Sequence, residues 1–317
     1  MDIIWNVPVD LDLQALHLVG LESFEPSGRS TTNPRTVPLI SGRIDQLYLH
    51  AAHVGEVEIE TARVPNGIEL KRLSASLPTG QLSASGDWTE RNGLNLTRLD
   101  ATLNSDNFGA LLREWALSAV LKGGTGQLDV SLAWDSTPQD LSYDSVNGAM
   151  SLALRDGRLE ELDPGAGRLV GLLSLAALPR RLRLDFSDVF GEGLEFDRIE
   201  GTMSIERGSV RTDDLTMEGP AAEILVTGRS GLADKQFDYV VTVVPKVSGA
   251  LPVAGGLVWG PQVGAVILLV QQVLQSEIDK ASQTRYQVTG TWDAPVIKRI
   301  TPPRSATQSG SGGAGKE

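Results

Sequence analysis

Few residues of this chain have the types and spacings that catalysis or metal binding requires. The sequence contains 0 cysteines and 3 histidines, so thiolate chemistry and cysteine metal sites are excluded. His50 and His53 are three positions apart, which in a strand places them on opposite faces. The segment 228–231 misses the G-x-S-x-G serine motif by one residue. We therefore predict no metal site, no cofactor and no activated serine.

Two further patterns could carry chemistry. The segment 165–171 reads GxGxxxG at the start of an expected helix, which is where a phosphate-binding loop would lie. The βαβ alternation that such a loop needs is absent, so we interpret the glycines as a tight strand-to-helix turn. Adjacent carboxylates occur at Asp213 with Asp214 and at Glu160 with Glu161. A glycosidase pair could be built from carboxylates, but nothing selects one, and we expect them at bulges or turns.

A cluster of three arginines follows the second expected helix, at Arg180, Arg181 and Arg183. One interpretation is a solvated strand edge. The other is contact with lipid phosphate at the mouth of a groove, because a guanidinium binds phosphate oxygens through charge-assisted hydrogen bonds. The sequence leaves both interpretations open.

Composition limits the partners of the chain. It has 317 residues, a formal net charge of −12 and a pI near 4.8. Nucleic-acid binding would need a basic stripe, so we expect no nucleic acid as a partner. Met1 leads directly into Asp2-Ile3-Ile4-Trp5, without the basic start and apolar core of a signal peptide. We expect either a cytosolic protein or a piece of a longer chain, and the latter is favoured because the chain starts within a sheet.

Regular turn signals predict long β-strands. The pairs Asn66-Gly67, Thr79-Gly80 and Asn92-Gly93 are spaced 13 residues apart, and Asn-Gly is a strong hairpin signal. Strands of about 11 residues between such turns would each span about 35 Å.

An internal repeat indicates how the sheet grows. Segments 66–77 and 92–103 share the pattern NG-[IL]-x-L-x-R-L-x-A-x-L at a period of 26 residues. In both copies the apolar alternation slips by one position around the arginine, and segment 208–217 repeats the slip. A one-residue slip would reverse the faces, so we predict a β-bulge in each segment. The repeat itself predicts a sheet that extends by adding hairpins.

Each predicted strand has one apolar face, as in antiparallel sheets with a solvated side. Too few helices are expected to cover that face, so the sheet must fold onto itself. A closed sandwich or barrel satisfies this constraint, and so does a taco-shaped groove lined with aliphatic side chains. Such a groove would hold acyl chains. Its predicted lining residues are Leu82, Ala84, Trp88, Leu94, Leu96, Leu99, Leu128, Val130, Leu132, Leu152, Leu154, Ile224, Val226 and Val288.

Three short helices are expected. The first covers 106–116 and is capped by Asp106, the second covers 164–178, and the third covers 261–283 near the C-terminus. Residues 301–317 have almost no apolar content and are predicted to be disordered.

No charged residue interrupts the stretch 247–276. Its first half is rich in Gly and Pro, and its all-apolar helical run is too short to span a membrane. Two interpretations of the stretch remain open. It forms either a helix within the core or a helix that closes a groove or touches a membrane. We predict that part of the stretch is exposed at one end of the sheet and faces a bilayer. The predicted membrane-facing residues are Leu251, Val253, Leu257, Val258, Trp259, Val263, Val266, Ile267 and Val270.

Segment 162–228 contains the run PGAGRLVGLLSL-x-ALPRRL-x-LDFSDVF and then GPAAEI-x-x-x-G, and segment 286–295 reads YQVTGTWDAP. These motifs resemble the C-terminal region of the YhdP-type, AsmA-like proteins of Gram-negative bacteria. The resemblance implies a periplasmic β-groove that contacts phospholipid, with other envelope proteins as further partners. It also implies an inner-membrane anchor at the N-terminus of the full-length protein, and we expect that anchor to lie outside this chain.

The expected fold is mainly β, with long antiparallel strands in a twisted, curled, taco-like groove sheet over residues 1–300 and about three short helices. The expected function is that of a lipid-binding groove segment of a phospholipid transporter that connects the inner and outer membranes, and not an enzyme. The alternatives are a structural or adhesive β-protein of the envelope and, less favoured, a polysaccharide-active enzyme.

Overall fold

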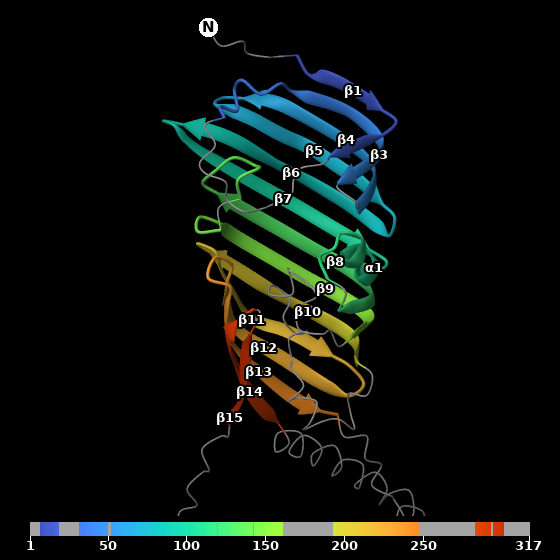
Figure 1. The fold of residues 1–317 in the computed structure, drawn as a ribbon, viewed down its shortest axis with the longest axis vertical. Helices are drawn as coiled ribbons and strands as arrows, with labels where there is room; N and C mark the ends of the chain where they lie inside the picture. Colours follow the sequence, from blue (N-terminus) through green and yellow to red (C-terminus); the bar gives the residue numbers. More distant parts are fainter. Residues whose placement is uncertain are drawn as a thin grey trace, which may run out of the picture.

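In the part of the chain that it describes, a computed structural model contains 15 strands and one helix. The described residues are 7–18, 32–49, 52–118, 120–141, 143–160, 193–246, 283–292 and 294–300. Within these ranges the chain forms a single 15-stranded sheet (Figure 1). The strands are β1 (Val9–Leu13), β2 (Leu16–Leu18), β3 (Ile40–Leu49), β4 (Ala52–Val64), β5 (Gly67–Leu77), β6 (Gly80–Arg91), β7 (Leu94–Ser105), β8 (Leu121–Trp134), β9 (Asn147–Leu159), β10 (Leu194–Glu206), β11 (Ser209–Glu218), β12 (Ala222–Gly231), β13 (Gln236–Pro245), β14 (Thr284–Thr291) and β15 (Pro295–Ile300).

The sheet is open and follows the order of the chain. From β3 to β15 each strand pairs antiparallel with the next, while β1 and β2 both pair parallel with β3. Figure 1 shows the strands succeeding one another from blue to red along the long axis of the molecule. Among the described strands, β1 and β15 lie at opposite ends and do not pair. The prediction of long antiparallel strands in one curved sheet is therefore confirmed, and a closed barrel is excluded for this part of the chain.

The predicted turns connect strands of the predicted length. Strands β4 to β10 have 11 to 14 residues each. Between β6 and β7, Asn92 and Gly93 have φ angles of 54° and 80°, as a type I′ hairpin turn requires. Between β4 and β5, Asn66 has a φ of 75° after Pro65, which suits a type II turn.

The predicted bulges occur in two of the three segments. The register of β5 shifts between Leu70 and Leu73, and that of β11 shifts between Thr212 and Leu215. Strand β7 pairs with β6 without interruption from Leu94 to Ser105, so the bulge predicted in segment 92–103 is wrong.

Without that bulge, Leu94 and Leu96 lie on the opposite face of β7 from Leu99. The prediction that they share a face with Leu99 is therefore wrong. Leu94 is 71% exposed, in agreement with this placement.

The described residues contain one helix, α1 (Phe108–Glu114). It falls inside the predicted range 106–116, but its cap is Asn107 and not Asp106. The Asn107 side-chain oxygen accepts a hydrogen bond from the Ala110 backbone N–H at 2.9 Å. The helices predicted at 164–178 and 261–283 and the tail 301–317 lie outside the described residues, so the prediction of about three helices is not confirmed.

The bulge in β11 has its own polar partner. Where the ladder between β10 and β11 is interrupted, the Asp214 carboxylate accepts hydrogen bonds from the backbone N–H and the hydroxyl of Thr202, each at 2.8 Å. Burial, the largest single influence, raises the pKa of Asp214, but the hydrogen bonds from Thr202 and Thr212 together hold it below its usual value. Asp214 thus replaces the interstrand partner that the bulge removes.

We predict that Asp214→Asn destabilises the protein at neutral pH by about 1 kcal/mol, because the amide cannot accept both hydrogen bonds and the site is partly solvated. The folded-state pKa is lowered, so this stabilisation is present above the unfolded-state pKa and is lost as pH falls through the folded-state value. Urea denaturation between pH 7 and pH 3 measures it. The difference from the wild type should shrink on acidification. The neighbouring change Asp213→Asn should have little effect, and an equal loss in both variants would contradict the role of Asp214.

Candidate functional site

Within the described ranges, one face of the sheet carries an extended apolar surface. Interstrand pairs place side chains in rows that cross many strands, because directly opposed residues point to the same side. One row runs from β5 to β9 through Ala75, Leu82, Leu103, Leu128 and Leu152. We call the side of the sheet that bears this row the apolar face and the other side the polar face.

Most of the predicted lining residues share this face. A second row passes through Ala84 and Val130, a third through Leu99 and Leu132, and a further row includes Trp88. From Leu154 a row continues across β10 and β11 to Ile224 on β12. Val226 and Val288 lie on the same face of β12 and β14. Of the fourteen predicted residues, Leu94 and Leu96 alone lie on the polar face.

The burial of the apolar face varies from strand to strand. Leu82, Leu99 and Leu128 are half-buried. By contrast, Leu152 and Ile224 have exposed fractions of 4% and 1%. Leu82, Leu99 and Leu128, on β6 to β8, are therefore more accessible than Leu152 and Ile224.

One margin of the apolar face is closed by tryptophans and by two loops. Trp88 donates its indole N–H to the Asn95 side chain at 2.8 Å, and Trp134 donates to the Thr137 carbonyl at 2.9 Å. The Arg63 guanidinium donates to the carbonyls of residues 34 and 37, each at 2.8 Å, and fixes the segment before β3. Burial lowers the pKa of Arg63. These hydrogen bonds tie the two tryptophans and the segment before β3 to this margin.

Helix α1 forms the other margin. Phe108 and Leu111 belong to the same buried cluster as the strand residues and are 3% and 0% exposed. Gly109 lets the helix approach β8, because a Cβ atom there would lie 2.4 Å from the Leu121 carbonyl oxygen. Between the margins, the segment of β8 from Gly126 to Trp134 spans roughly 26 Å.

At the end of α1, the indole N–H of Trp115 is buried and has no hydrogen-bond partner among the described residues. A buried donor without a partner costs free energy. An acceptor supplied by a bound molecule would remove this cost.

The polar face carries hydroxyls and carboxylates that satisfy one another. A hollow of about 620 Å³ crosses β5 to β10 on this face, lined mainly by Ser, Thr, Asp and Ala. Thr102 donates to Asp129 at 2.7 Å, and Ser131 donates to Asp100 at 2.5 Å. These carboxylates are therefore engaged in pairs between neighbouring strands.

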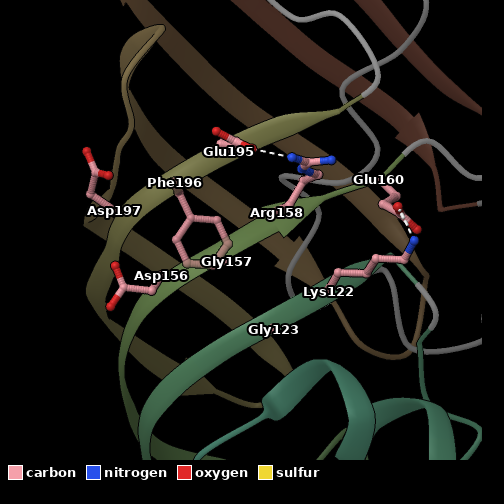
Figure 2. A pocket seen from close by; sticks show the side chains of 9 residues that line it. All are labelled: Lys122, Gly123, Asp156, Gly157, Arg158, Glu160, Glu195, Phe196 and Asp197. Carbon is pink, nitrogen blue, oxygen red and sulfur yellow. Dashed lines mark hydrogen bonds and ion pairs between the residues drawn. The ribbon is translucent and has the colours of Figure 1, made fainter.

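A second hollow, of about 440 Å³, lies at the start of β8, the end of β9 and the start of β10 (Figure 2). Its charged lining includes the ion pair of Lys122 with Glu160, at 2.5 Å, and that of Arg158 with Glu195. The sequence offered no clear signal for this site, because Asp156-Gly157 resembles an ordinary turn. In the structure both residues lie inside β9.

The other expectations have different outcomes. Among the described residues, no group of three or more His, Cys, Asp or Glu side chains could hold a metal ion. In the same part of the chain, no helix is long and apolar enough to cross a membrane. His17, Tyr48 and His53 form a ring stack, with centroids 4.3 and 4.9 Å apart. The following predicted residues lie outside the described part: Arg180, Arg181, Arg183, Leu251, Val253, Leu257, Val258, Trp259, Val263, Val266, Ile267 and Val270.

The fold and the site define a mainly β protein built as one open, curved sheet whose two faces differ in polarity. A family model described as YhdP protein matches residues 2–297, and the chain belongs to this family. The chain is 31% identical over 238 residues to the "Intermembrane phospholipid transporter YhdP" of Escherichia coli (strain K12). This match covers 74% of the chain and 19% of that protein, so the matched part spans less than a fifth of the relative's length. No solved structure matches the chain.

The two margins of the apolar face give a prediction about their tryptophans. Trp134→Phe should lower the free energy of unfolding by about 1–3 kcal/mol beyond the loss of ring area, because it leaves the buried Thr137 carbonyl without its donor. Trp115→Phe should cost less, because it removes a buried donor that has no partner. Urea denaturation of both variants measures the difference. Equal losses would show that the Trp115 N–H has an acceptor in solution.

Proposed function

We propose that this chain is a segment of a phospholipid transporter between the inner and outer membranes, and that it holds acyl chains on its apolar face. The observation that carries the proposal is the continuity of the apolar rows, which cross from β5 to β12 without a charged side chain. Membership of a family that includes a phospholipid transporter supports the same function.

The energetics of acyl chains suit such a face. Each buried methylene contributes about 0.8 kcal/mol, so a lipid tail needs a long apolar surface and not a few specific contacts. Rows of Leu, Val and Ala present similar surface at every strand. A tail that moves from one strand to the next therefore exchanges one apolar contact for an equivalent one. No deep free-energy minimum holds the tail at one strand.

The accessible region between the two margins is the proposed entry to this surface. Leu82, Leu99, Leu128, Val130 and Leu132 are half-buried there, whereas the corresponding rows on the later strands are buried. We propose a groove with aliphatic walls over residues 1–300, and the half-buried rows support it. We place the chain in the periplasm, within a longer protein that is anchored in the inner membrane.

Two parts of the proposal concern residues outside the described ranges. The uncharged stretch 247–276 would contact a bilayer at the C-terminal end of the sheet. The arginines of 180–183 would contact lipid phosphate. Other envelope proteins would be further partners.

We propose that the chain is not an enzyme. The carboxylates that line the hollow on the polar face, Asp100 and Asp129, accept hydrogen bonds from Ser131 and Thr102. A structural or adhesive role in the envelope is the competing class, and lipid content separates the two. Organic extracts of a purified lipid carrier would contain phospholipid, whereas extracts of a structural β-protein would not.

The two faces of the sheet provide matched variants. Leu82→Glu and Leu132→Glu place a charge where acyl chains would lie, and an unpaired charge in an apolar site is costly. We expect about tenfold less bound phospholipid in these variants, corresponding to about 1.4 kcal/mol in binding free energy. Leu94→Glu makes the same change on the polar face and should leave the lipid content unchanged. Mass spectrometry of organic extracts gives the measurement, and circular dichroism checks that the variants are folded. Equal lipid loss in all three folded variants would refute the assignment of the faces.

A further inference from the structure

We infer that the hollow at the ends of β8, β9 and β10 binds the head group of a phospholipid that carries a primary ammonium, of the ethanolamine type. The inference rests on the proposed function and adds a preference among lipids to it. The site is the open hollow of about 440 Å³ described above, and its volume lies within the range of small-ligand sites.

Negative side chains outnumber positive side chains in the lining of this hollow. Its lining has two positive side chains, Lys122 and Arg158, and each is already in an ion pair with a glutamate. Two further carboxylates, Asp156 and Asp197, line the cavity and form no ion pair in the described part of the chain. Figure 2 shows these two aspartates on one side of the Phe196 ring and the two ion pairs on the other.

This arrangement matches a zwitterion in one orientation. The ammonium would lie between Asp156 and Asp197, where N–H donors meet carboxylate oxygens in charge-assisted hydrogen bonds. The phosphate would lie toward the ion pairs of Lys122 and Arg158, whose side chains are 58% and 43% exposed. An anionic head group without an amine would meet the two aspartates with no compensation.

The backbone holds the two aspartates beside the apolar core. Asp156 has a φ of 55°, and the buried positions of β10 there are Phe196 and Ile199, three residues apart instead of two. The face alternation therefore shifts at this point. The Phe196 ring lies over Gly157, where a Cβ atom would come within 2.4 Å of the ring.

Apolar residues continue directly beside the cavity. Phe196 lines the cavity, is 2% exposed and belongs to the buried cluster of the sheet. Leu121, Leu159 and Leu194 form the interstrand row adjacent to that of the ion pairs, on the opposite face of the sheet, and they are in or against the same cluster. A lipid that turns over the ends of these strands would therefore keep its tails on the apolar face and its head group at the ion pairs.

A bare metal ion fits the cavity less well than an organic ammonium. No cluster of three or more metal-binding side chains occurs in the described ranges. Hard divalent cations need six or more oxygen ligands at close distance. Two separated carboxylates suit a larger cation with several N–H donors.

The test uses the purified chain loaded from vesicles of phosphatidylethanolamine and phosphatidylglycerol in equal amounts with identical acyl chains. We expect about threefold enrichment of phosphatidylethanolamine in the extracted lipid, as exposed charge pairs of this kind provide. The double variant Asp156→Asn with Asp197→Asn should return the ratio to that of the vesicles and leave the total lipid unchanged. Asp213→Asn, an exposed aspartate outside the cavity, is the matched control and should keep the enrichment.

Two further arms separate the possible outcomes. Phosphatidylcholine, whose quaternary ammonium has no N–H donor, should not be enriched. Free phosphoethanolamine in excess should reduce the enrichment without removing the tails from the protein. No lipid in the wild type would refute the proposed function itself. Bound lipid without enrichment, or enrichment that survives in the double variant, would overturn the head-group inference alone.

Discussion

The register of the β-ladder is the constraint on which the rest of the molecule depends. In one open sheet, the apolar face exists only if every strand presents its apolar residues to the same side, and a slip of one position would reverse a strand. The bulges in β5 and β11 each add a residue exactly where the sequence alternation slips, so that Leu70 and Leu73, and likewise Thr212 and Leu215, stay on one face. The bulges therefore preserve the continuity of the rows, which is the feature that the proposed function needs.

The repeat of segments 66–77 and 92–103 shows where sequence reasoning succeeded and where it failed. Turns, strand lengths and the parity of most apolar residues follow from local patterns, and the structure agrees with them. The bulge predicted in β7 is absent because contacts with neighbouring strands decide it. Thr97 faces inward opposite Trp88 and donates its hydroxyl to the Ser136 carbonyl at 2.7 Å, while Asn95 accepts the Trp88 indole N–H. These partners stabilise polar residues on the apolar side and leave Leu94 and Leu96 on the other, and none of them is visible in the pattern of β7 itself.

The candidate sites differ in how far they could be predicted. The residues of an apolar row can be predicted from the alternation of apolar and polar residues along each strand, which the sequence of a single strand displays. The cavity of Asp156 and Phe196 depends on a positive φ in β9, on a ring from β10 and on a lysine from β8, so it exists only after three strands have paired. The N-cap of α1 is a local case of the same kind. Asp106 and Asn107 are both good caps by type, and only the geometry of the first turn selects Asn107.

Polar groups on the apolar face have partners inside the protein, and this affects what the face can recognise. Ser105 donates to the Thr79 carbonyl at 2.6 Å, and Ser230 donates to the Gln236 carbonyl at 3.1 Å and accepts the Trp292 indole N–H at 2.8 Å. Burial raises the pKa of Tyr239, beside Ser230, to about 12, so this hydroxyl stays neutral. A hydrocarbon chain on such a face meets few polar atoms that need a partner, and the face has little means to distinguish one acyl chain from another. Selectivity must then come from the ends of the strands, where charged side chains and solvent are available. Under the proposed function, tails would bind without specificity and head groups would bind weakly at the margin, so a lipid would be selected by its head group and would still move along the sheet.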